Sequence, residues 1–171
     1  VNLPDSVETI GKYAFGNCKL DKFIVPKKAT KLNDIFEYGR VDKLYLHSNV
    51  ESGASDLCKC AKELYLEDTT NLFAYLGTSD CSYNIKMIYI NGEPLTNLVI
   101  PDTYSDIVGD FLRNCLSLET VTISAKNTNI GKWAFRECTN LKRIILEEGV
   151  ETVTGDIFSN SNKFDYRKIP S

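Results

Sequence analysis

Six cysteines and one histidine are the residues of this 171-residue chain best suited to chemistry. A catalytic cysteine needs a base, and His47 is the single histidine available for that role. Cys58 and Cys60 are one residue apart, and no second Cys or His pair follows at zinc-finger spacing. Nucleotide-binding and hydrolase motifs are also missing. We therefore expect no catalytic residue, no metal and no cofactor, and a protein that is not an enzyme.

Five of the cysteines share one position, about seven residues before the central residue of a short apolar run. They are Cys18, Cys58, Cys81, Cys115 and Cys138. One interpretation is a ladder of small buried hydrophobic residues. The alternative is a disulfide framework, which requires paired Cα atoms to lie within about 7 Å. Cys60 falls outside the pattern under either interpretation.

The apolar runs themselves repeat along the whole chain. Their central residues are Ile24, Tyr45, Tyr65, Tyr89, Val99, Thr122 and Ile145, which lie 20 to 24 residues apart except for one gap of 10. Such a period is typical of solenoid proteins, in which each repeat buries its apolar face against its neighbours. We expect one domain over residues 1–171 with about seven repeats. Val1–Leu3 has the same phase, which predicts a strand there and a chain truncated at the N-terminus.

Each repeat combines two patterns. Apolar residues flank the central residue in runs such as Leu44–Leu46, so we expect a short strand whose central side chain points outward. The stretch Gly-x-x-Ala-Phe-x-x-Cys at 131–138 has apolar positions three to four apart, which suits one or two helical turns facing the core. Phe15, Phe36, Phe135 and Phe158 occupy the aromatic position of this stretch.

The gap of 10 falls between Tyr89 and Val99. Asn91-Gly92 between apolar runs is a strong hairpin signal, because both residues tolerate positive φ. We predict an antiparallel β-hairpin insert over residues 88–100. Pro94 weakens its second strand or places that strand at a sheet edge.

The outward positions of three successive strands carry tyrosine. Tyr45, Tyr65 and Tyr89 should lie side by side, with strands about 5 Å apart. A tyrosine row on an open sheet is suited to binding protein, because the ring is large and its tip is polar. The alternative is that the rings only stabilise neighbouring strands. The predicted binding face consists of Tyr45, Tyr65, Tyr89, Lys43, His47, Glu63, Glu67 and Met87.

Composition narrows the class of partner. The net charge is −3 and the pI about 5.3, so the chain lacks the basic character of a nucleic-acid-binding protein. No apolar stretch approaches the roughly 20 residues that a membrane helix needs. We therefore expect a protein partner, no nucleic acid and no membrane insertion in this segment.

Residues 3–18, with the sequence LPDSVETIGKYAFGNC, resemble the BspA-type (Treponema-type) leucine-rich repeat, as do Val99–Asp102 and Ile130–Cys138. The resemblance implies an α/β leucine-rich-repeat solenoid that is right-handed, with short parallel strands, short helical or irregular turns and, here, the hairpin insert. It brings no catalytic residues. It implies a secreted or cell-surface location, commonly in bacteria, and non-enzymatic recognition of proteins, including adhesion to host or microbial proteins. The alternative is a structural spacer that projects another domain from the cell surface.

Overall fold

The computed structural model describes residues 1–76, 85–124, 129–148, 150, 155–161 and 165–168. The chain forms two compact units, residues 1–94 and 95–171, and each is described by itself. Each unit is a β-solenoid whose main sheet takes one short strand from each turn, as the repeat period predicts. The expectation of one continuous domain over 1–171 stays a prediction.

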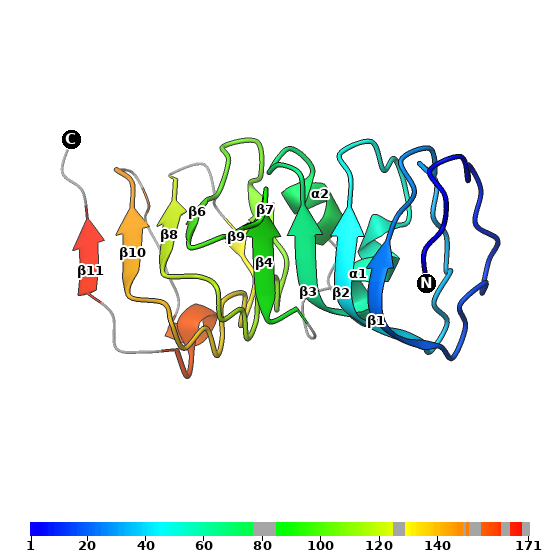
Figure 1. Ribbon diagram of the computed structural model, residues 1–171. Coiled ribbons are helices and arrows are strands. Elements are labelled where there is room, and N and C mark those ends of the chain that lie inside the picture. Colours follow the sequence, from blue (N-terminus) through cyan, green and yellow to red (C-terminus); the bar gives the residue numbers. More distant parts are fainter. Residues whose placement is uncertain (77–84, 125–128, 149, 151–154, 162–164, 169–171) are drawn as a thin grey trace. The chain divides into compact units, whose positions relative to one another are not determined.

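Four parallel strands form most of the five-stranded sheet of the first unit. They are β1 (Lys19–Ile24), β2 (Arg40–Leu46), β3 (Ala61–Leu66) and β4 (Met87–Ile90). They pair in sequence order, and Figure 1 shows them side by side with their arrows parallel. Leu44, Leu64 and Ile88 are in register and fully buried, as the in–out–in pattern predicts. Each such side chain contributes about 1.5–3 kcal/mol of burial energy, which holds the strands in this register.

The hairpin forms, but it is shorter than predicted. β4 pairs antiparallel with β5 (Glu93–Pro94) through the turn Asn91-Gly92. The second strand ends at Pro94 because proline has no N–H to continue the ladder. Residues 97–99 instead form β6 (Asn97–Val99), a parallel strand of the second unit. The predicted range of 88–100 is therefore wrong beyond Pro94.

In the described part of the chain the two α-helices lie in repeats that depart from the Gly and Phe pattern. In the first unit α1 (Ala54–Cys60) and α2 (Leu72–Leu76) lie on one side of the sheet (Figure 1). Leu57, Leu72 and Leu76 of these helices are buried. Phe36 packs on the same side, with its ring 5.1 Å from that of Phe23.

At residues 11–18, 109–115 and 131–138 the Gly and Phe pattern forms turns, so the helical interpretation is wrong there, whereas Gly155–Phe158 does form a short 3-10 helix. Residues four apart have left-handed backbone, with φ of 62° at Tyr13 and 56° at Asn17. Phe15 N–H donates to Ile35 O in the next repeat at 2.8 Å. These turns therefore hydrogen-bond between repeats, whereas a helix would satisfy its own backbone groups. The strand expected at residues 1–3 does not form either.

The second unit repeats the same plan. β6, β8 (Thr120–Ile123), β10 (Arg143–Leu146) and β11 (Asp165–Lys168) form a parallel sheet. β7 (Asp106–Ile107) pairs with β9 (Asn129–Ile130), and a 3-10 turn, η1, spans Gly155–Phe158. Phe135 is buried, and its ring stacks on that of Phe158 at 5.5 Å.

Candidate functional site

The three tyrosines form one row across the first sheet. Tyr45, Tyr65 and Tyr89 are register partners on β2, β3 and β4. The alternation of each strand turns its leucine and isoleucine neighbours into the core, so the tyrosines face outward. Ile24 of β1 extends the row as the partner of Tyr45, and Pro94 of β5 lies beside Tyr89.

The rings stack face to face. The Tyr45 and Tyr65 centroids are 4.2 Å apart with planes 12° from parallel, and those of Tyr65 and Tyr89 are 4.5 Å apart at 6°. The ammonium of Lys22 lies 4.5 Å from the Tyr45 centroid and covers the outer face of that ring. Both faces of Tyr45 and Tyr65 are therefore occupied, and only ring edges and hydroxyl groups remain for a ligand.

A second row of outward residues, two of them charged, borders the stack. Lys43, Glu63 and Met87 are register partners, and Lys43 Nζ lies 3.8 Å from Glu63 Oε2. The Tyr65 hydroxyl donates to the same carboxylate oxygen at 2.7 Å. Burial, reinforced by this hydrogen bond, raises the pKa of Tyr65 well above its ordinary value. Tyr65 is thus a neutral donor at neutral pH, and Glu63 is held between a cation and a phenol.

An open groove of about 640 Å³ runs along the carboxyl ends of these strands. The exposed Ile24, the edges of Tyr45 and Tyr65, and the segment around Leu3 form its apolar walls. The turn Asn91-Gly92 lies at its rim. The sequence pattern placed Ile24 outward, but only the fold brings Leu3 to the same groove. The predicted face is therefore extended by residues that the repeat pattern alone did not identify.

Two predicted residues behave differently from the tyrosines. His47 is 6% exposed, so the expectation that it points outward is wrong. Its Nδ1 accepts from Asn49 N–H at 3.2 Å, and its Nε2 lies 3.0 Å from Pro26 O, which requires the neutral Nε2–H tautomer. β2 ends at Leu46, so the strand alternation no longer governs the next residue. Glu67 is exposed and accepts from the backbone of Ser48 at 3.3 Å.

Three of the phased cysteines are buried, as the ladder interpretation predicts. Cys58, Cys115 and Cys138 are buried and Cys18 is half-buried; none of these four is in a disulfide. Cys81 lies outside the described residues. Burial raises the pKa of the Cys115 and Cys138 thiols, which makes them poor nucleophiles. The part of the chain that the structure describes contains no group of three His, Cys, Asp or Glu placed to hold a metal.

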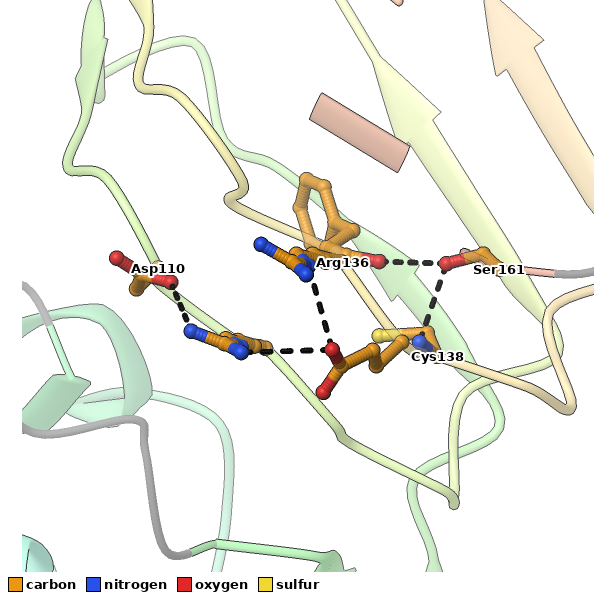
Figure 2. A network of polar contacts seen from close by, with 7 residues as sticks. Asp110, Arg136, Cys138 and Ser161 are labelled. Atoms are coloured by element: carbon orange, nitrogen blue, oxygen red, sulfur yellow. Dashed lines mark hydrogen bonds and ion pairs between the residues drawn. The ribbon is translucent and has the colours of Figure 1, made fainter. Parts of the chain in front are cut away.

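The second unit has a polar network, shown in Figure 2. The Arg113 guanidinium lies 3.5 Å from Asp110 and 3.4 Å from Glu137, which Arg136 also contacts at 3.2 Å. Ser161 donates to Phe135 O and accepts from the backbone N–H of Cys138. The two arginines and two carboxylates of the network neutralise each other across successive repeats. We interpret this network as structural.

The sequence matches the BspA type leucine rich repeat region in six copies, over residues 1–91 and 84–171. The chain belongs to this leucine-rich repeat family. No curated protein matches the sequence.

The chain is also similar to two solved leucine-rich repeat proteins. The protein from Bacteroides ovatus is 20% identical with a TM-score of 0.49, and the match covers 98% of this chain and 47% of that one. The protein from Eubacterium ventriosum is 17% identical with a TM-score of 0.39, and the match covers 97% and 59%. This BspA-type chain thus spans about half the length of these relatives. None of the helices in its described part has the length and apolar character needed to cross a membrane.

Proposed function

We propose that this chain is a non-enzymatic protein-recognition module that binds its partner along the groove of the first unit. The observation that carries the proposal is the groove itself, which is lined by Leu3, Tyr45 and Ile24, the last 42% exposed. A contiguous exposed apolar surface with a polar rim is typical of a protein-binding site. Glu67 and Asn91 supply polar groups at this rim.

The occlusion of the ring faces favours a protein partner over a sugar or a nucleic-acid base. Those ligands bind aromatic residues by stacking on a free face. Here the faces of Tyr45 and Tyr65 are covered by Lys22 and by the neighbouring rings. Ring edges, hydroxyl groups and the aliphatic surface of Ile24 suit the side chains and backbone of a polypeptide.

The state of His47 supports a non-enzymatic role. Both ring nitrogens are engaged with backbone groups, and the ring is buried. A general base needs a lone pair within reach of a substrate proton. The single histidine of the chain therefore uses both ring nitrogens to hold backbone groups around the loop after β2.

The family resemblance supports a secreted or cell-surface location and adhesion to host or microbial proteins as the biological setting. The second candidate is a structural spacer. The tyrosine stack favours it, because cross-strand aromatic pairs stabilise a sheet whether or not anything binds. The two functions differ in whether the groove has affinity for another protein.

The test compares two matched substitutions of exposed apolar residues. Ile24→Asp places a charge in the groove, whereas Val99→Asp changes the corresponding outward position of β6, where Val99 is 62% exposed. Binding to a panel of purified extracellular-matrix proteins and isolated bacterial surface proteins is measured by surface plasmon resonance. We expect wild type and Val99→Asp to bind the same partner and Ile24→Asp to lose it at least tenfold, about 1.4 kcal/mol. Equal binding by all three excludes this groove, and no binding by wild type favours the spacer.

A further inference from the structure

The turn between β4 and β5 has the sequence Asn91-Gly92, and its side-chain positions are unusually unconstrained by neighbouring atoms. Asn91 and Gly92 have φ of 49° and 86°, and both are exposed at the tip of the hairpin. No atom lies within 4 Å of the position that a Cβ of Gly92 would take. The Asn91 N–H donates to Leu66 O at 2.9 Å, but within the described residues its side-chain amide has no hydrogen-bond partner.

We propose that Asn91-Gly92 is a site of spontaneous deamidation that changes the rim of the groove. The backbone nitrogen of Gly92 attacks the side-chain carbonyl carbon of Asn91, a new C–N bond forms, and ammonia leaves. Water then opens the resulting cyclic imide at either carbonyl, which yields aspartate or isoaspartate. The overall reaction consumes one water and releases one ammonia, with no enzyme, metal or redox partner.

Two structural features single out this asparagine. Asn91 is the only asparagine of the chain that glycine follows, so no side chain hinders the attacking nitrogen. Other asparagine amides are held by hydrogen bonds. Asn71 donates to Ser48 O at 2.5 Å, and Asn140 donates to Leu116 O at 2.7 Å. Asn91 has the side-chain freedom that ring closure requires, at an exposed loop tip.

The modification alters both charge and backbone at the groove. Either product places a carboxylate at a rim that already carries Glu67. The isoaspartate form also adds one methylene to the backbone of a two-residue loop, where loop length sets the pairing register. The Ile90–Glu93 pair next to the turn should then be lost. An effect on partner binding rests on the proposed function, whereas the modification does not.

The test is incubation of the intact protein in mildly alkaline buffer at body temperature, followed by peptide mapping with mass spectrometry. Exposed Asn49, followed by Val50, and exposed Asn140 are internal controls on the same molecule. We expect Asn91 to convert several times faster than either, as paired aspartate and isoaspartate peptides of equal mass. The Gly92→Ala variant adds a methyl group that meets no neighbouring atom, although φ of 86° strains any side chain there. It should slow conversion, with circular dichroism as the check on folding.

Conversion of Asn91 no faster than that of Asn49 or Asn140 overturns the proposal. Unchanged conversion in Gly92→Ala also overturns it, because attack by the glycine nitrogen would then not be the route. Neither readout involves a partner, so failure here leaves the recognition proposal intact. If aged protein and the Asn91→Asp variant both bind a groove partner as tightly as unmodified wild type does, deamidation has no effect on the groove. That result would not contradict the deamidation reaction itself.

Discussion

The central tyrosine of the stack should stabilise the first unit more than either neighbour. Tyr65 has a ring on both faces, whereas among described residues Tyr89 has one. Each stacked pair contributes about 0.5–1.5 kcal/mol beyond burial, so stacking at Tyr65 amounts to about 1–3 kcal/mol. Its hydrogen bond to Glu63 adds about 1 kcal/mol, less than for a buried bond because the site is half-exposed. Tyr65→Ala should therefore cost about 2–4 kcal/mol plus the lost burial, and Tyr89→Ala clearly less.

Urea unfolding followed by far-ultraviolet circular dichroism measures these differences. Tyr65→Phe keeps the ring and should lose only about 1 kcal/mol. The single tryptophan, Trp133, lies in residues 95–171, so its fluorescence reports on the second unit as an internal reference. Equal costs for Tyr65→Ala and Tyr89→Ala, with no cost for Tyr65→Phe, would refute the stack as a stabilising unit.

The phenol of Tyr65 also predicts a dependence on pH. Its pKa is raised in the fold above the ordinary 10.0, mainly by burial. The stabilising contribution is therefore complete below pH 10.0 and is lost above it, because the unfolded chain releases this proton first. One such group changes the free energy of unfolding by at most about 1.4 kcal/mol per pH unit. The advantage of wild type over Tyr65→Phe should shrink above pH 10.0; a constant gap would contradict the argument.

Two further predictions concern the packing of the repeats. Gly53→Ala should cost at least about 2 kcal/mol in urea unfolding, because φ is 81° and the new methyl group would overlap the backbone of Leu32. Gly92→Ala has the same strain without the overlap, and an equal cost for both would contradict this account. Iodoacetamide should label half-buried Cys60 in the native state before buried Cys115 and Cys138, as peptide mapping will show. Equal labelling rates would contradict the burial of the thiols.

The repeat period predicted the strands and their register because both depend on local alternation. Tyr45 and Tyr65 are neighbours, as expected, because equal spacing places equal positions in register. The turns were missed because apolar residues three to four apart suit both a helix and successive left-handed turns. Asn17 tolerates the left-handed region, but Tyr13 gives no such sequence signal. His47 was misplaced because the end of a strand depends on tertiary contacts that alternation does not encode.

The site is less predictable than the fold because the fold does not require it. In the second unit the equivalent outward row is Val99, Thr122 and Ile145, without an aromatic residue. β-Branched residues suit a sheet surface, so the same architecture forms without tyrosine. Replacing the three tyrosines of the first unit by Val, Thr and Ile in that order should therefore preserve the circular dichroism spectrum and cooperative unfolding. Binding of a groove partner should fall because two ring edges of the wall are removed. A variant that unfolds would show that the tyrosine row is needed to stabilise the sheet. A variant that binds the partner as tightly as wild type does would show that the tyrosines are not part of the binding site.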